Sequence, residues 1–191
     1  MPTEAEINML ARVARTKAPT PEDDLSTDTS ILLLAAASYS ARPKEDATVP
    51  TGFDPIAVAL FEAIVEAAYL VASADGVVDT EERKTFERVV FAACGGAVAA
   101  NQVSALVGDF EGLLEDDGLD ARIAAVAKQV SKKSHAHEVL RIAALIAQTT
   151  DGVADSERNV LEKIAKACKL EVSEVDVALA EVKAALAEPS A

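Results

Sequence analysis

Two short acidic turns hold the residues whose type and spacing could bind a cation. Their acids are Asp75, Asp79 and Glu82 in the first turn, and Asp151, Asp155 and Glu157 in the second. Carboxylate oxygens are the usual ligands of hard divalent cations, and a cation relieves the repulsion between neighbouring carboxylates. The sequence therefore predicts Ca²⁺, Mg²⁺, Mn²⁺ or Zn²⁺ as a possible cofactor.

One turn alone supplies too few ligands, because calcium takes about six to eight oxygens and magnesium takes six. Water or acids from elsewhere would complete the shell. Glu62 and Glu138 occupy equivalent places on the segments that lead into the two turns. If the two halves pack antiparallel, we expect Glu62 to approach Asp151 and Asp155. Glu138 would then approach Asp75 and Asp79.

The same acids have a purely structural interpretation. Asp-Gly commonly ends a helix, and Asp79 with Glu82 three residues later has the spacing of a capping box. An EF-hand is excluded, because Val71 would stand at its first ligand position. Cation binding and helix capping both remain open at this point.

Other residues offer little chemistry. His135 and His137 lie two apart on a predicted helix, so they point in different directions. Cys94 and Cys168 form no disulfide framework, and we expect buried free thiols near helix ends. No nucleophile constellation, phosphate-binding glycine loop or zinc-type cysteine pattern occurs, and the acids show no arrangement for general acid–base work. We therefore expect a protein that is not an enzyme.

Helical apolar spacing recurs along the chain and no segment has a period of two, which predicts an all-α fold. Asp28 or Ser30 is expected to cap the second helix, and Ser173 the last. The expected helical segments are 3–17, 30–41, 55–74, 79–94, 101–114, 119–131, 136–150, 155–169 and 173–187.

An internal repeat relates the two turns at an offset of 76 residues. Asp75, Gly76 and Asp79 match Asp151, Gly152 and Asp155, and after a one-residue gap Glu82-Arg83 matches Glu157-Arg158. Two copies favour a pseudo-symmetric bundle of helix–turn–helix repeats over a solenoid. We expect Leu70 and Ile146 to be buried at equivalent positions.

The paired turns, together with Ile164–Leu170 before the turn at Val172–Val175, resemble the tellurite-resistance TerB family over Pro55 to Leu186. The resemblance implies an all-helical domain of two pseudo-symmetric halves and an acidic surface that chelates metal. It also implies a role in stress-linked assemblies near the membrane. The chain departs from the family in its long N-terminal extension, and in Ala154 and Ser156 at the second turn.

Two proline-containing linkers divide the extension. We expect residues 1–54 to form an N-terminal extension with two short helices, and residues 55–188 to form the TerB-like domain. Ala18–Asp24 should be mobile, whereas Ile31–Leu34 should be buried.

Charge limits the partners. The 191 residues include 32 acids and 18 Lys or Arg, a net charge of −14. This balance disfavours nucleic acid and anionic membrane surfaces. Glu62 and Glu66 argue against membrane insertion of Ile56–Ala74, and no secretory signal is evident, so we expect a cytoplasmic protein.

The sequence supports two functional hypotheses. In the first, the protein is a non-enzymatic TerB-like module that binds a cation in a metal (tellurite) or envelope stress response. Its partners would be other stress-response proteins, including membrane-associated ones. In the second, it is an acidic interaction adaptor that binds no metal, and the Asp-Gly turns only cap helices.

Overall fold

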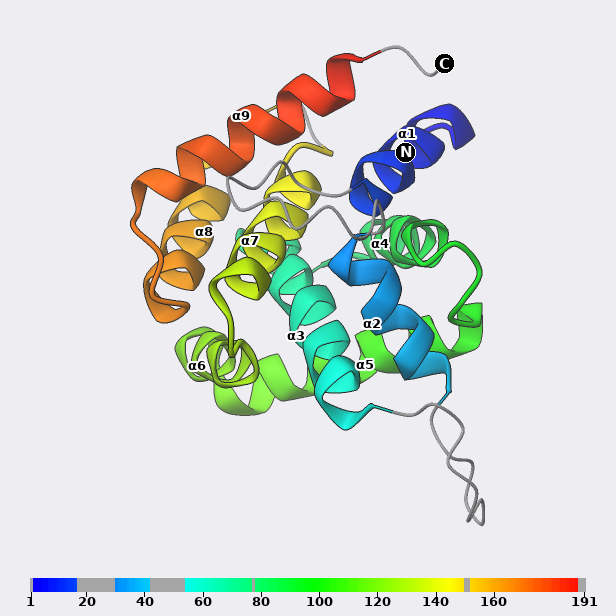
Figure 1. The fold of residues 1–191 in the computed structure, drawn as a ribbon, viewed down its shortest axis with the longest axis horizontal. Coiled ribbons are helices and arrows are strands. Elements are labelled where there is room, and N and C mark those ends of the chain that lie inside the picture. Colours follow the sequence, from blue (N-terminus) through cyan, green and yellow to red (C-terminus); the bar gives the residue numbers. More distant parts are fainter. Residues whose placement is uncertain (1, 17–29, 42–53, 77, 150–151, 189–191) are drawn as a thin grey trace.

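The computed structural model describes residues 2–16, 30–41, 54–76, 78–149 and 152–188. These residues form helices and no β-strand, so the all-α prediction is confirmed (Figure 1). The helices are α1 (Glu4–Arg15), α2 (Ile31–Ser40), α3 (Pro55–Ala72), α4 (Thr80–Ala93), α5 (Ala100–Asp117), α6 (Leu119–Gln129), α7 (Lys133–Ala147), α8 (Asp155–Ala167) and α9 (Ser173–Ala187).

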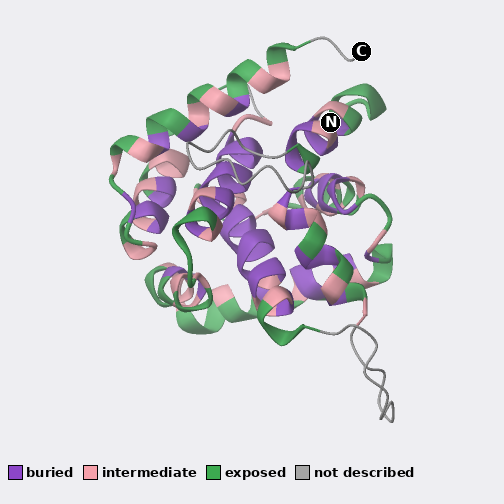
Figure 2. Ribbon diagram, in the orientation of Figure 1, coloured by how far each residue is buried: buried purple, intermediate pink, exposed green. Residues whose placement is uncertain are grey.

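Helices α3 and α7 form the centre of the molecule. From Ala63 to Val71 every residue of α3 is buried, and α7 is buried without interruption from Glu138 to Ala147. A helix that is apolar on all sides must be surrounded by other elements. Accordingly α3 packs on α7, α2 and α6, and Figure 2 shows both central helices largely buried. Leu70 and Ile146 are both buried, as predicted.

The two central helices run in the same general direction in Figure 1, and their C-terminal ends lie toward the same end of the molecule. The antiparallel arrangement, on which the expected approach of Glu62 and Glu138 to the opposite turns depended, therefore does not hold for these two helices. This direction decides where the two acidic turns lie, because each turn follows the C-terminal end of one central helix.

Helices α1 and α2 pack into the same core as the other helices. Ile7, Leu10 and Leu32 belong to one buried cluster with residues of α3 and α7. The burial predicted for Ile31–Leu34 holds for Leu32, which is 2% exposed, but is wrong for Leu34, which is 53% exposed. The segment Ala18–Asp24 lies outside the described residues.

The helix starts follow their local sequences in most places. Ser30 caps α2 through its hydroxyl, and Asp54 Oδ1 accepts a hydrogen bond from the N–H of Ile56 at 2.9 Å. The predicted Ser173 cap is wrong: Ser173 is the first helical residue of α9, and Val172 precedes it without a side-chain hydrogen bond. Helix α7 starts at Lys133 instead of Ala136, and α5 continues to Asp117.

By length and composition α3 is apolar enough to cross a membrane, but two thirds of it is buried inside the fold. Its Glu66 is 5% exposed and pairs with Arg122 of α6 at 2.6 Å. Arg122 also contacts Asp117 at 2.9 Å. The ion pair of Glu66 and Arg122 therefore joins α3 to α6, and the sequence did not indicate this pair.

Candidate functional site

The first acidic turn is built as a helix stop followed by a helix cap. Gly76 has φ of +142°, a conformation that residues with a Cβ rarely adopt. Asp79 Oδ1 then accepts hydrogen bonds from the N–H groups of Glu81 at 2.7 Å and Glu82 at 2.9 Å. Glu82 in return accepts the N–H of Asp79 at 2.8 Å, which completes a capping box. Asp75 is exposed and takes no part in the box.

The second turn reproduces only half of this arrangement. Gly152 has φ of +124°, and Glu157 accepts the N–H of Ala154 at 2.8 Å. Ala154 occupies the cap position, where it offers no side-chain oxygen, and Asp155 is the first helical residue of α8. The predicted match of Asp79 with Asp155 is therefore corrected. The one-residue gap lies before the cap, so Asp79 corresponds to Ala154. Asp151 lies outside the described residues.

The two turns approach each other. Burial raises the pKa of Glu157, and the negative charge of Asp75 raises this pKa further. This effect places Asp75 of the first turn near the start of α8. The common direction of α3 and α7 in Figure 1 agrees with this placement. A carboxylate from each turn thus contributes to one region of negative potential.

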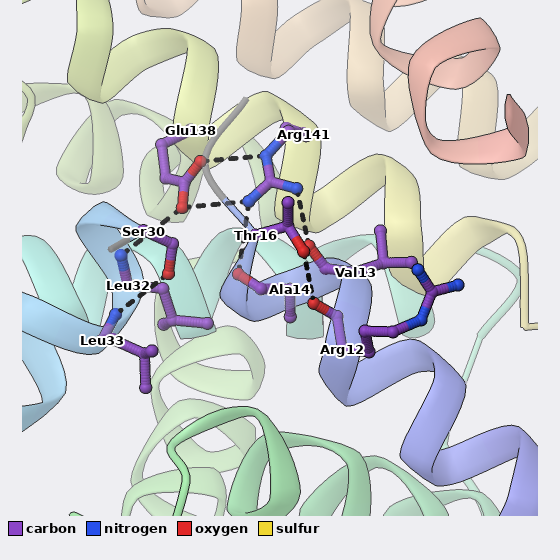
Figure 3. Close-up of polar contacts among 9 residues, drawn as sticks. All are labelled: Arg12, Val13, Ala14, Thr16, Ser30, Leu32, Leu33, Glu138 and Arg141. Atoms are coloured by element: carbon purple, nitrogen blue, oxygen red, sulfur yellow. Dashed lines mark hydrogen bonds and ion pairs between the residues drawn. The ribbon is translucent and has the colours of Figure 1, made fainter. Parts of the chain in front are cut away.

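Glu138 lies in the core, where it forms an ion pair with Arg141 (Figure 3). The side chains of Glu138 and Arg141 are 3% and 6% exposed, and the Arg141 Nε–Glu138 Oε2 distance is 3.0 Å. Glu138 Oε1 also accepts the N–H of Leu32 at 3.4 Å. These partners belong to α7 and α2, so the predicted approach of Glu138 to the first turn is corrected. Glu62 is half-buried on α3.

Arg141 is the residue that the sequence reasoning missed. Its guanidinium donates to the carbonyl oxygens of Val13 at 2.9 Å and Ala14 at 3.2 Å, at the C-terminal end of α1. One signal was present in the sequence: Glu138 and Arg141 are three residues apart on an otherwise apolar segment.

Two arginines that follow the capping glutamates form similar networks. Arg83 pairs with Glu87 four residues later at 3.0 Å and with Glu111 of α5. Arg158 pairs with Glu162 four residues later at 3.4 Å and with Asp176 of α9. In each case the arginine joins the helix after the turn to the next helix along the chain.

The histidines and cysteines do not form a site. His137 Nδ1 lies 3.8 Å from Glu174, and burial together with Lys132 lowers the pKa of His135. Burial raises the pKa of Cys94 to about 12 and of Cys168 to about 11, so both thiols are poor nucleophiles. Cys94 is buried as predicted, whereas Cys168 is half-buried.

Within the described ranges no group of three or more His, Cys, Asp or Glu side chains is placed to hold a metal ion. The described acids of the turns instead serve as caps or remain exposed. Comparison of the chain with protein-family models, with curated proteins and with solved structures finds no match.

Proposed function

We propose that the protein is a non-enzymatic helical interaction module whose acidic turns shape and charge a docking surface. The observation that carries this proposal is the capping box of Asp79 and Glu82, in which both carboxylates already serve backbone N–H groups. Their role as caps needs no metal. The net charge of −14 makes a basic protein surface the favoured partner, and nucleic acid a disfavoured one.

The proposal includes the two-repeat, TerB-like arrangement. Support comes from the corresponding roles of Glu82 and Glu157, and from the corresponding ion-pair networks of Arg83 and Arg158. Helix α3 packs on α5, and α7 packs on α9, although the second contact is more extensive. The halves also differ, because α7 packs on α8 whereas α4 packs chiefly on α1 and α5. In this proposal the module acts in the cytoplasm, with partners in a metal or envelope stress response.

Cation binding is the second candidate, and one observation favours it. Asp75 and Glu157 come from different turns, yet the charge of Asp75 adds to the effect of burial in raising the pKa of Glu157. A divalent cation between the turns would relieve this repulsion.

A thermal-unfolding titration separates the two candidates. A cation at a hundredfold excess over its dissociation constant stabilises a folded protein by about 2.7 kcal/mol, which is a rise in Tm of about 5–10 °C for a chain of this size. The interaction proposal predicts that Ca²⁺, Mg²⁺, Mn²⁺ and Zn²⁺ leave the Tm unchanged. A rise that is lost in the double variant Asp75→Asn with Asp79→Asn would favour the cation candidate instead.

The double variant is chosen so that charge is removed while the cap is kept. Asn caps helices about as well as Asp, so the α4 cap should survive the Asp79→Asn change. Circular dichroism should therefore show unchanged helix content in the variant. Asp79→Ala serves as the matched control for loss of the cap, and we expect it to cost about 1 kcal/mol of stability.

A further inference from the structure

The buried ion pair of Glu138 and Arg141 lies where both N-terminal helices reach α7. Arg141 donates to the carbonyls of Val13 at 2.9 Å and Ala14 at 3.2 Å, at the C-terminal end of α1. Glu138 Oε1 accepts the N–H of Leu32 at 3.4 Å, at the N-terminal end of α2. One ion pair thus contacts the backbone of two helices, as Figure 3 shows.

The charges of the pair match the polarity of the two helix ends. A helix carries partial negative charge at its C-terminal end and partial positive charge at its N-terminal end. The guanidinium of Arg141 faces the C-terminal end of α1, and the carboxylate of Glu138 faces the N-terminal end of α2. Each ion of the pair therefore stabilises the docking of a different helix.

Each ion also holds the other in place. The guanidinium of Arg141 donates to both carboxylate oxygens of Glu138, at 3.0 and 3.2 Å. A guanidinium is a rigid planar fork, so a shift of Arg141 after loss of α1 also moves the donors that fix Glu138. Loss of α1 therefore weakens the site that binds α2, and loss of α2 weakens the site that binds α1.

Two further contacts join the same helix ends. An apolar cavity of about 20 Å³ is lined by Ala14 of α1, by Leu32 of α2 and by residues of α3, α4 and α7. Gly95 follows α4, and a Cβ there would lie 3.6 Å from Leu33 Cδ2 of α2 and 3.9 Å from Arg15 Cδ of α1. The C-terminal end of α1 and the N-terminal end of α2 thus share one junction with the rest of the fold.

We propose that the Glu138–Arg141 pair couples α1 to α2, so that the two helices dock and undock as one unit. Opening of this unit uncovers the faces of α3, α4 and α7 that line the cavity, while these three helices stay packed on one another. A change confined to α1 therefore alters the docking of α2, and the reverse. This coupling is a conformational property of the fold and is independent of the proposed interaction function.

Native-state hydrogen exchange of the wild type tests whether the unit exists. The amides of Ile7 in α1 and Leu34 in α2 donate to the preceding helical turn, so they exchange when their helix opens. We expect one common opening free energy for the amides of α1 and α2, lower than that for α3 and α7. Different values for α1 and α2 would overturn the proposal. Equal values in all four helices would overturn it as well, because no separate unit would then exist.

Truncation of a buried side chain in α1 should change the exchange of α2. Leu10 is 4% exposed, and Leu10→Ala removes part of the docking face of α1. A buried Leu→Ala change shifts an opening equilibrium by about thirtyfold or more, and we expect the α2 amides to exchange faster by this factor. Asn8→Gln, at an exposed position of α1, is the matched control and should leave α2 exchange as in the wild type. Unchanged α2 exchange in Leu10→Ala would contradict the coupling.

The role of the ion pair is tested by the same truncation in an Arg141→Lys background. Lysine keeps the positive charge beside Glu138 but lacks the fork that reaches the carboxylate and two carbonyls together. The response of α2 to Leu10→Ala should then be strongly reduced. An undiminished response would assign the coupling to the direct contacts near Gly95 and reject the role of the pair. If Arg141→Lys does not fold, Glu138→Gln gives the same comparison, because it removes the charge but keeps an acceptor for the N–H of Leu32.

Discussion

At the scale of single residues, the buried pair of Glu138 and Arg141 is the least ordinary feature. Removing two charges from water costs several kcal/mol per ion, and their attraction repays this only when other hydrogen bonds are satisfied as well. Here the backbone of α1 and α2 supplies those bonds. The pair is therefore stable only with both N-terminal helices in place.

Loss of one partner of this pair should be costly. We expect Glu138→Ala to lower the free energy of unfolding by about 3–5 kcal/mol, because Arg141 is left buried without its countercharge. Urea denaturation followed by circular dichroism measures the loss. Lys163→Ala, which breaks the exposed pair with Asp120, is the comparison and should cost much less. Equal losses in the two variants would contradict this assignment.

Glu157 should make stability depend on pH. Its pKa in the folded protein lies above the ordinary value of 4.5, so folding favours the protonated carboxyl. Its contribution is therefore fully present below pH 4.5 and is lost as the pH rises through the folded-state pKa. Glu157→Gln mimics the protonated form and can still accept the N–H of Ala154. We expect it to stabilise the protein at pH 7 by about 0.5 kcal/mol, since solvent screens this group.

Urea denaturation of the wild type and of Glu157→Gln at pH 7 and at pH 4 tests whether protonation of Glu157 stabilises the folded state. The advantage of the variant should disappear at the lower pH. Asp75→Asn removes one cause of the shift, so in that background the advantage at pH 7 should be smaller. An advantage of the variant that grows toward low pH would refute the interpretation.

At the scale of elements, two glycines in α5 differ in their surroundings. A Cβ at Gly112 would meet open space, whereas a Cβ at Gly108 would lie 3.2 Å from Nη2 of Arg83. Glycine in a helix is less favourable than alanine by about 0.5–1 kcal/mol. We expect Gly112→Ala to stabilise the protein by about that amount.

Gly108→Ala should gain less, because Arg83 must move and weaken its contacts with Glu111 and the carbonyl of Ser104. Differential scanning calorimetry of the two variants measures the difference. Equal gains would mean that Arg83 shifts without cost, and that its network contributes little to the packing of α4 on α5.

Two helix caps that depend on residues close together in the chain were predicted correctly from the sequence. The Asp79–Glu82 capping box and the Ser30 cap depend on residues three apart, so their spacing is visible in the chain. The match of Asp79 with Asp155 was wrong, because Asp is a favoured cap residue and Ala is not, yet Ala154 holds the cap position of α8. Only the conformation around Gly152 decides which residue begins the helix.

At the scale of the whole molecule, the sequence could not reveal how the extension docks. The hydrogen bond from Arg141 to Val13 joins residues 128 apart, and no local pattern marks the carbonyl end of α1 as its partner. For the same reason Glu138 was assigned to a cation site instead of the core. The direction of α3 and α7 also depends on packing that hydrophobic spacing alone does not determine.

Truncation tests whether residues 55–188 form a domain of their own. The chain 54–191 lacks the groups that satisfy Glu138 and Arg141, as well as the buried side chains of α1 and α2. We expect it to unfold at a clearly lower urea concentration than the full chain, with circular dichroism as the measurement. An unchanged midpoint would instead support the domain boundary expected from the sequence.

The aromatic rings give the molecule two optical reporters of its own. The chain has two tyrosines and no tryptophan. The ring centroids of Tyr39 of α2 and Phe61 of α3 are 4.7 Å apart, and those of Tyr69 of α3 and Phe86 of α4 are 5.8 Å apart. Tyrosine emission therefore comes from two known contacts, and replacing either tyrosine by phenylalanine isolates the other. Undocking of α2 and opening between α3 and α4 can then be followed separately, without an added label.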